Sequence, residues 1–492
     1  MNTKALRQKV LDLAIHGKLV PQNPNDESAT LLLEKIRAEK TEKIKKGELK
    51  ADKKDSFIFI GSDNRHYEQF ADGTLKDIED EIPFDVPEGW CWCRLTNVAI
   101  TELGKTLDAK KNKGKLYDYL CALNVKWYSF DFTTLKQIRL EEKEKERYLV
   151  RKGDLLICEG GDVGRAAIWE SENPIYYQNA LHRVRFYQNI NQYFFLHVLN
   201  YYKNLGIIDD VSGGVTIKHF TQNSMQKLLF PLPPLAEQER IASSIDNIFT
   251  QIGMVDQYKS ELQTVLRQTK SKILDLAIHG KLVPQNPDDE PAEELLKRIA
   301  TSDNRPYEKV EEEPFEIPDS WKWVKLGDIG QTNIGLTYHP NDISNTGIIV
   351  LRSNNIQNDK LCFDDIVKVN SNTKILNNQY INNGDILICA RNGSQSLVGK
   401  CVLLNNLKEK TSFGAFMAVF RSNYNRYILK YLQSKYFKDY MFESNSTQIH
   451  QLTQSMLKDA LIPFPPEKEQ VRIVAKIDEL YSQLDQIQNN LV

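Results

Sequence analysis

The chain has no long hydrophobic run and no large excess of charge of either sign. None of its apolar stretches reaches the roughly 18 residues that a membrane-spanning helix needs. Its 492 residues include 64 lysines and arginines against 66 acidic residues, so the formal charge is −2 at pH 7. Any nucleic-acid site must therefore be a local patch that the total charge does not reveal.

The sequence also lacks the common catalytic motifs. It contains no GxxxxGK[ST] phosphate loop, no HExxH and no GxSxG. The segment GGDVG at Gly160 has the wrong spacing for a nucleotide loop and joins two predicted strands, which favours a turn that brings backbone near a ligand. His16 and His279 lie at matching helix ends, where dipole compensation or an interface role is favoured over catalysis. We therefore predict no catalytic residues, no metal site and no cofactor in this chain.

The seven cysteines are few, odd in number and scattered. Cys91 and Cys93 have no matching Cys/His pair downstream, so the spacing of a zinc site is missing. No signal peptide is recognisable at the N-terminus. This usage predicts buried, reduced thiols and a cytoplasmic location.

Residues 233–282 are predicted to form one long helix around which the chain is organised. Pro233 and Pro234 suit the first helical turn, and Gly280 suits the stop. Apolar side chains between them follow the alternating four-three spacing of a coiled-coil seam, at Ile241, Ile245, Ile248, Ile252, Val255, Leu262 and Ile273. Such a seam requires a partner helix.

The two ends of the chain repeat the two parts of this helix. FPPEKEQVRI at 464–473 repeats LPPLAEQERI at 232–241 and continues the seam spacing at Ile473, Ile477, Leu480, Leu484 and Ile487. LDLAIHGKLVPQNP occurs at 11–24 and again at 274–287. The two ends together make one further copy of the central helix. We expect them to pair with it and to close a pseudo-two-fold, circularly arranged molecule.

Two β-rich domains are predicted between the helical segments. The opening segment IPFDVPEGWCWCRL at 82–95 is similar to EPFEIPDSWKWVKL at 313–326. GDLLIC at 153–158 is similar to GDILIC at 384–389. Asn124 and Asn355 fall at paired positions. The predicted fold class is α/β in the α+β sense, with the β-rich domains joined by an antiparallel pair of long coiled-coil helices. The predicted boundaries are a helical region 1–62, a domain 63–232, a central helix and connector 233–302, a domain 303–463 and a C-terminal helix 464–492.

The first copy carries a charged insertion at residues 40–55 that has no counterpart after Ala300. Its composition favours a solvated loop or an extension of the preceding helix over a basic arm that touches phosphates.

Loops of both domains carry side chains suited to DNA. Lysine and arginine neutralise phosphates, whereas asparagine, glutamine and arginine can bind the edges of adenine and guanine. The candidates in the first domain are Lys105, Lys110, Lys111, Lys113, Lys115, Asn124, Lys126, Trp127, Tyr128 and Arg165. Those in the second domain are Arg352, Ser353, Asn354, Asn355, Arg391, Asn392, Ser394, Gln395 and Lys400.

The whole chain resembles the specificity subunits of type I restriction-modification systems. The resemblance rests on the PP…EQxRI openings and the ILDLAIHGKLVPQ ending of the helices, together with GDLLIC and GDILIC inside two variable domains. It implies two target-recognition domains that each read one half of a bipartite site in double-stranded DNA. It further implies two modification subunits that use S-adenosylmethionine, two ATP- and Mg-dependent restriction subunits, and no activity of this chain alone.

Two other functions are compatible with the same residues. The chain could be a stand-alone bipartite DNA-binding regulator or a defence subunit without nuclease partners, which co-purification with a methyltransferase would distinguish. It could also be a coiled-coil adaptor that binds only proteins, which loss of DNA binding on charge reversal of Lys110, Lys111 and Lys113 would exclude.

Overall fold

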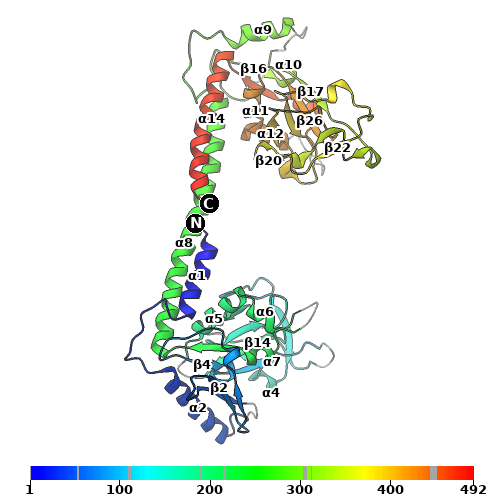
Figure 1. Ribbon diagram of the computed structural model, residues 1–492. Helices are drawn as coiled ribbons and strands as arrows, with labels where there is room; N and C mark the ends of the chain where they lie inside the picture. Colours follow the sequence, from blue (N-terminus) through cyan, green and yellow to red (C-terminus); the bar gives the residue numbers. More distant parts are fainter. Residues whose placement is uncertain are drawn as a thin grey trace. The chain divides into compact units, whose positions relative to one another are not determined.

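The structure is a computed structural model that describes residues 2–491 except 52–54, 109, 111, 188–189, 214–217, 303–306, 308, 312 and 444–450. The chain divides into two compact units, Met1–Gln257 and Tyr258–Val492. Helix α8 (Leu235–Ile278), 44 residues long, begins in the first unit and ends in the second. The prediction of one long central helix is therefore confirmed (Figure 1).

In unit 1, α1 (Thr3–Ile15) lies antiparallel to the first part of α8 (Figure 1). Asn2 caps α1 by accepting a hydrogen bond from the backbone N–H of Ala5. The guanidinium of Arg7 pairs with Asp256 at 3.0 Å, and further along α1 its apolar side chains join one core with Ile241 and Ile245.

In unit 2, α14 (Glu467–Asn490) lies antiparallel to the last part of α8 (Figure 1). The Tyr481 hydroxyl donates to the carbonyl of Lys270 at 3.0 Å, and the Lys270 ammonium pairs with Asp485. The two chain ends thus each cover one part of α8, as their repeat of its sequence predicts.

The predicted seam is buried over much of its length. Ile241, Ile245, Ile252, Ile273, Ile473 and Ile477 are at most 8% exposed, and Ile248, Leu480 and Leu484 are partly buried against the two cores. Three predicted seam residues are not buried: Val255, Leu262 and Ile487 are 36–45% exposed. The difference has a simple reason: most of the buried positions also pack against a globular core, whereas these three belong to none of the described cores.

Each helix that ends in the repeated sequence stops at a glycine with a left-handed backbone. Gly17 and Gly280 have φ angles of +65° and +66°. A Cβ atom at these positions would lie 2.3 Å from Pro87 Cγ and 2.4 Å from Pro318 Cγ, so a larger residue would meet both strain and a clash. Gly280 is therefore the helix stop that its position in the sequence predicts.

The β-rich domain of unit 1 contains two four-stranded sheets. The antiparallel sheet has the order β12 (Ala166–Ile168), β11 (Leu155–Cys158), β14 (Leu181–Phe186), β5 (Ala99–Leu103). The mixed sheet has the order β10 (Leu149–Val150), β13 (Ile175–Tyr177), β6 (Lys115–Leu120), β9 (Lys136–Leu140), with β13 and β6 parallel. Two strand pairs complete it, β4 (Cys91–Arg94) with β15 (Leu229–Leu232) and β7 (Val125–Lys126) with β8 (Ser129–Phe130).

Unit 2 repeats this arrangement except for one edge strand of the mixed sheet, which pairs at the opposite edge. Its antiparallel sheet runs β17 (Gln331–Ile334), β26 (Met417–Arg421), β23 (Ile386–Cys389), β24 (Cys401–Leu403). Its mixed sheet runs β18 (Ile343–Ser344), β22 (Val367–Val369), β19 (Ile348–Leu351), β25 (Thr411–Phe413), with β19 and β25 parallel. The pairs are β16 (Lys322–Lys325) with β27 (Leu461–Phe464) and β20 (Ile356–Gln357) with β21 (Lys360–Leu361).

Each unit also contains shorter helices. Those of unit 1 are α2 (Ala29–Lys45), α3 (Leu95–Val98), α4 (Glu142–Lys145), α5 (Gln192–Asn204), α6 (Ile207–Val211), α7 (Gln222–Lys227) and the 3-10 turn η1 (Glu79–Glu81). Those of unit 2 are α9 (Ala292–Ser302), α10 (Leu326–Ile329), α11 (Asn425–Gln433), α12 (Lys435–Glu443) and α13 (Gln454–Asp459). Unit 2 also has the 3-10 turns η2 (Pro340–Asp342), η3 (Ser353–Asn355), η4 (Asn377–Gln379) and η5 (Gln395–Leu397).

One hydrogen-bonded joint fixes the helices to the domain in each unit. In unit 1 the buried carboxylate of Glu237 accepts from Trp90 Nε1 at 2.9 Å and from Gln22 Nε2 at 2.7 Å. In unit 2 the buried carboxylate of Glu469 accepts from Trp321 Nε1 at 3.0 Å and from Gln285 Nε2 at 2.6 Å. Burial raises the pKa of both carboxyl groups, and the donated hydrogen bonds oppose that rise. The joint explains why Trp, Gln and Glu recur at these places in both sequence copies.

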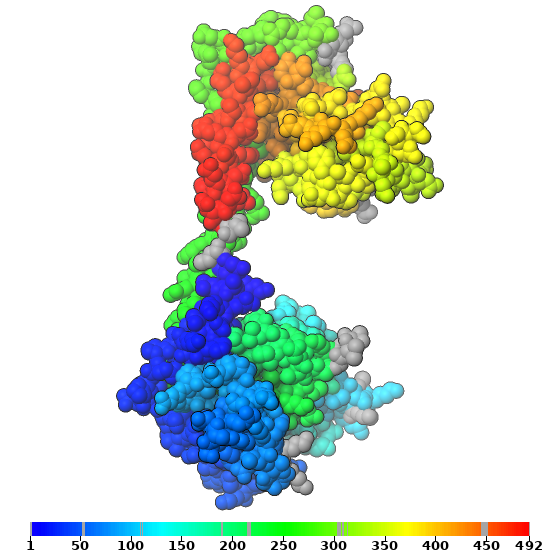
Figure 2. Space-filling model, viewed as in Figure 1, coloured from blue at the N-terminus to red at the C-terminus, as the bar shows by residue number. Residues whose placement is uncertain are grey.

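The charged insertion is only partly a solvated segment. Residues 40–45 extend α2, as predicted, but Lys40 is 9% exposed and its ammonium binds Asp55 at 2.6 Å. The chain then forms a three-stranded antiparallel sheet of β1 (Ser56–Ile60), β2 (His66–Phe70) and β3 (Leu75–Asp77), which lies at the surface of unit 1 (Figure 2). This sheet runs across the boundary predicted between residues 62 and 63.

Candidate DNA-recognition surfaces

The lysines predicted to bind DNA in the loop at 105–115 of unit 1 differ in whether they are exposed or already bound within the protein. Lys110, Lys113 and Lys115 are exposed and can meet phosphates. Lys105 is not available in this way, because its half-buried ammonium pairs with Glu144 and lies 5.6 Å from the centre of the Tyr148 ring. Lys111 lies outside the described residues.

Asn124 and Asn355 are equivalent, as predicted, but they are not base readers. The Asn124 side chain is fully buried, accepts from the N–H of Cys121 at 2.9 Å and donates to the carbonyl of Asp131 at 2.9 Å. Asn355, 1% exposed, accepts from the N–H of Arg352 at 2.8 Å and donates to the carbonyls of Cys362 and Asp365, both at 3.0 Å. Both amides hold a turn together, because buried backbone groups need partners.

The aromatic residues after Asn124 make contacts within unit 1. Trp127 packs against the main core of unit 1. Tyr128, at φ +66°, places its hydroxyl 3.2 Å from Nδ1 of His197, and its ring lies against Phe249 of α8. Burial raises the pKa of the Tyr128 hydroxyl. Two residues of this group reach the surface: Lys126, at 3.8 Å from Asp131, and Tyr128, which is 38% exposed.

Arg165 is a structural residue as well. Its Nη2 donates to the carbonyl of Ala122 at 2.8 Å, its Nη1 lies 3.4 Å from Asp162, and its side chain is 20% exposed. The arginine therefore connects the loop after β11 to the turn before β7, and its guanidinium is not free to bind a guanine base.

In unit 2 the polar loops do converge. The Arg352 guanidinium and the Asn354 amide both bind the Asp365 carboxylate, the former at 3.0 Å. Asn392 donates to the Ser353 hydroxyl at 3.2 Å and so joins the loop at 391–400 to the loop at 352–358. Ser394 and Gln395 are exposed beside this contact. The sequence-predicted residues of this domain, apart from Asn355, therefore form one surface.

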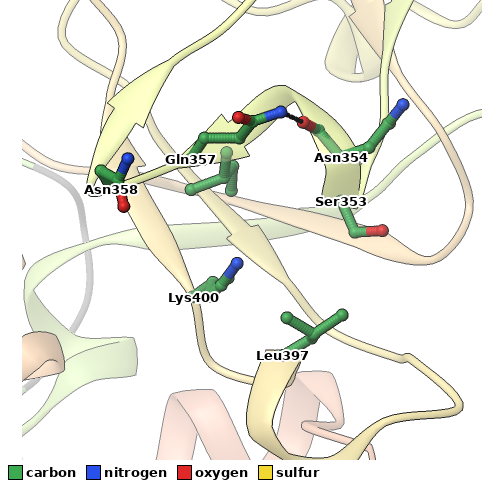
Figure 3. Close-up of a pocket in the computed structure, with 7 residues that line it drawn as sticks. Ser353, Asn354, Gln357, Asn358, Leu397 and Lys400 are labelled. Atoms are coloured by element: carbon green, nitrogen blue, oxygen red, sulfur yellow. Dashed lines mark hydrogen bonds between the residues drawn. The ribbon is translucent and has the colours of Figure 1, made fainter. Parts of the chain in front are cut away.

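Two cavities flank Ser353 and Asn354 on this surface. The first, about 420 Å³, is lined by Ser353, Asn354, Ile356, Gln357, Asn358, Leu397 and Lys400. Figure 3 shows Lys400 and Leu397 opposite the loop that carries Gln357 and Asn358, and Gln357 Nε2 donates to the carbonyl of Asn354 at 3.2 Å. This cavity combines one cation with several amides, which is the mixture that reads phosphates and base edges.

The second cavity is larger and more apolar. It has a volume of about 650 Å³ and is lined by Leu336, Thr337, Tyr338, Arg352, Ser353, Asn354 and the segment 414–417. Phe416 is 62% exposed, and the guanidinium of Arg391 lies 5.6 Å from its ring centre. Sequence reasoning missed Tyr338 and Phe416, which only the fold brings to Asn354, and it also missed Gln357 and Asn358 further along the loop at 352–358.

The described cysteines behave as ordinary buried thiols. Cys93, Cys121, Cys158, Cys389 and Cys401 are buried. Burial raises the pKa of Cys158 to about 11 and that of Cys401 to about 12, so both stay protonated at neutral pH. Within the described ranges no cluster of three or more His, Cys, Asp or Glu side chains could hold a metal ion.

Two β-rich domains of similar build, each with its own polar loop surface and an equivalent hydrogen-bonded joint to the helical frame, define a modular recognition protein. A family model described as "Type I restriction modification DNA specificity domain" matches residues 87–264 and 318–492. The chain belongs to this family, as its sequence resemblance predicted, and its role is DNA recognition.

Individual relatives span nearly the whole chain. The EcoAI specificity subunit of Escherichia coli type I restriction enzymes is 28% identical, over 97% of this chain and 88% of that protein. The Escherichia coli EcoEI specificity subunit is 26% identical, over 99% of this chain and 90% of that protein.

Solved structures share the fold. The HsdS subunit from Thermoanaerobacter tengcongensis matches with a TM-score of 0.50 at 18% identity, over 84% of this chain and 94% of that chain. A chain from a study of complex assembly and conformational transition of the type I R-M system matches with a TM-score of 0.55 at 19% identity, over 83% of this chain and 94% of that chain. In the part of the chain that the structure describes, no helix has the length and apolar character needed to cross a membrane.

Proposed function

We propose that this chain is the specificity subunit of a type I restriction-modification complex and that each β-rich domain reads one half of a bipartite site in double-stranded DNA. The observation that carries this proposal is the repeated build: the same antiparallel sheet and the same joint occur twice, whereas the loops at the candidate surfaces differ. Two readers on one frame suit a target with two different halves.

The central helix then sets the unspecified gap between the two halves. Helix α8 has 44 residues, which corresponds to a rigid length of about 66 Å at the rise of an α-helix. One turn of DNA is about 34 Å long, so a ruler of this length suits half-sites more than one turn apart.

Catalysis belongs to the partners in this proposal. Two modification subunits dock on the helical frame and use S-adenosylmethionine, and two restriction subunits add ATP- and Mg-dependent cleavage. The repeated frame offers two equivalent docking faces, which supports two copies of one modification subunit. A methyltransferase must also flip its target adenine, and readers on both sides would hold the flanking bases.

Domain exchange with the modification partner present tests the proposal. Methylation sequencing of host DNA first gives the bipartite target of the natural complex. Replacement of residues 83–232 by the matching domain of a relative that keeps Trp90 should change one half of that target and leave the other intact. A change in both halves would contradict modular reading. A chain that binds its target without retaining any methyltransferase on purification would instead be a stand-alone regulator.

A further inference from the structure

Each unit contains a tight turn that leads from its mixed sheet to its antiparallel sheet, and we call it the crossover turn. It comprises residues 178–181 between β13 and β14 in unit 1, and residues 414–417 between β25 and β26 in unit 2. The N–H of Leu181 donates to the carbonyl of Gln178 at 3.0 Å, and the N–H of Met417 donates to that of Gly414 at 2.8 Å. Both are therefore closed β-turns with the same register.

Equivalent backbone bonds hold the two turns. In unit 1 the N–H of Gln178 donates to Leu120 and that of Asn179 to Lys105, at 3.1 and 3.0 Å. In unit 2 the N–H groups of Gly414 and Ala415 donate to Leu351 and Leu336, both at 2.9 Å. A further N–H, from Glu159 or from Ala390, reaches the carbonyl at the third turn position.

A glycine backs each turn where no side chain fits. A Cβ atom at Gly104 would lie 2.2 Å from the carbonyl oxygen of Gln178, and one at Gly335 would lie 2.3 Å from that of Gly414. The close approach of the neighbouring strand leaves the turn no room to move. Whatever side chains it carries are presented rigidly, which lowers the entropy that binding must overcome.

The side chains on this common frame differ in kind. Unit 1 carries Gln178 and Asn179, and within the described part of the chain neither amide has a hydrogen-bond partner. Unit 2 carries no polar side chain at these places and instead presents Phe416, 62% exposed, with Arg391 against its ring. Ala180 in unit 1 is the equivalent of Phe416, because the carbonyl of each accepts from the residue that follows β11 or β23.

We propose that the crossover turn is a base-contacting element of each domain and that the two domains read DNA by different chemistry. Gln178 and Asn179 bind adenine edges by paired hydrogen bonds, since amides match that edge. Phe416 stacks on or enters a base step with Arg391 beside it. An apolar wedge unstacks the step that it enters, so it selects steps that unstack easily, such as pyrimidine–purine steps. This role of the crossover turn rests on the proposed DNA-reading function.

The test uses the chain in complex with its modification partner and the target that methylation sequencing has given. Phe416→Ala should lower the ratio of correct to one-base-altered methylation in the half read by unit 2 on the order of tenfold, and leave the other half unchanged. Gln178→Ala and Asn179→Ala should lower the same ratio in the half read by unit 1 and leave the half read by unit 2 unchanged. Ile343→Ala is the matched control, because Ile343 is a 52% exposed apolar residue elsewhere in unit 2.

A second readout separates stacking from mere packing. With 2-aminopurine placed at successive steps of the second half-site, the natural complex should raise fluorescence at one step. Phe416→Tyr should keep this signal, whereas Phe416→Ala should lose it together with half-site fidelity. Unchanged fidelity and unchanged fluorescence in Phe416→Ala would overturn the inference. So would a loss of co-purification with the modification partner at unchanged fidelity, because the turn would then contact protein.

The proposed function and the role of the crossover turn can be refuted separately. A natural complex that methylates DNA without any bipartite preference would refute the proposed function itself. A natural complex with a clear bipartite target that the three turn variants do not alter would refute only the role of the crossover turn.

Discussion

Removing the indole N–H of Trp321 should weaken the joint of unit 2 in a pH-dependent way. Trp321 is 1% exposed and donates to Glu469, which is equally buried and also accepts from Gln285. Trp321→Phe keeps an aromatic ring in the core but deletes one of the two donors that face the carboxylate. The variant thus separates the hydrogen bond from most of the packing.

The expected loss of unfolding free energy at neutral pH depends on whether the acceptor, Glu469, is charged. A hydrogen bond to an ionised group contributes about 1.5–3 kcal/mol, and a neutral one about 0.5–1.5 kcal/mol. The smaller ring should also remove about 1–2 kcal/mol of packing free energy. This part of the loss does not depend on pH. Trp321→Phe should therefore lower the unfolding free energy of unit 2 by roughly 2.5–5 kcal/mol at pH 7.

The sign of the pH dependence comes from the raised pKa of Glu469. Burial lifts this pKa above 4.5, so the folded state binds the proton more tightly than the unfolded state. Stability therefore falls as pH rises from about 4.5 through the folded pKa. Without the Trp321 N–H the folded pKa rises further, and the fall becomes larger. The destabilisation by Trp321→Phe should thus be greater at pH 7 than at pH 4.

Urea unfolding followed by far-ultraviolet circular dichroism at both pH values measures this difference. Trp90→Phe is the matched variant in unit 1, where Glu237 has the same partners, and it should show the same pH trend. An equal loss of stability at pH 4 and pH 7 would mean that Trp321 acts only through packing. It would refute the view that the joint is held by a buried charge.

Three further predictions concern the frame and the loops. Asn355→Ala should destabilise unit 2 by about 2–3 kcal/mol in thermal or urea unfolding, since a buried amide with three hydrogen bonds is removed; a stable variant with a relaxed half-site would contradict this. Lys113→Glu with Lys115→Glu should weaken binding to all DNA sequences and reduce the slope of log affinity against log salt by about 0.9 for each phosphate that is no longer neutralised, whereas a sequence-selective effect would indicate base contacts. One heptad inserted between Val255 and Leu262, where the seam is exposed, should lengthen the gap in the methylated target or abolish methylation, and an unchanged target would show that α8 is not the ruler.

The helical frame could be predicted from the sequence because its signals are local or repeated. The seam spacing, the prolines before Leu235 and the glycine at 280 each act within a few residues, and the repeat of α8 at the chain ends identifies its partners. The two β-rich domains could be matched through their shared strand sequences. The sheet of β1 to β3 was missed, because β1 directly follows a charged segment and neither β1 nor β3 has a second copy, although DNRHYEQ at 63–69 resembles DNRPYEK at 303–309.

The candidate DNA surface could be predicted only in part. Residue type marks a polar loop but does not say whether its side chains face solvent. Asn124, Asn355, Arg165 and Lys105 have the chemistry of DNA contacts, yet each is used by the fold. The sequence offered no signal for this, because the carbonyls and the carboxylate that bind them come from other turns and elements.

The family, the two-copy organisation and the antiparallel pairing of the chain ends with α8 can all be predicted from the amino-acid sequence, since they depend on hydrophobic periodicity and on repeated sequence segments. Which loop residues can reach a ligand is visible only in the folded molecule. That choice depends on sheet-to-sheet contacts between distant strands, which bring Phe416, Arg391 and Asn354 to one surface and bury Asn355 beneath it.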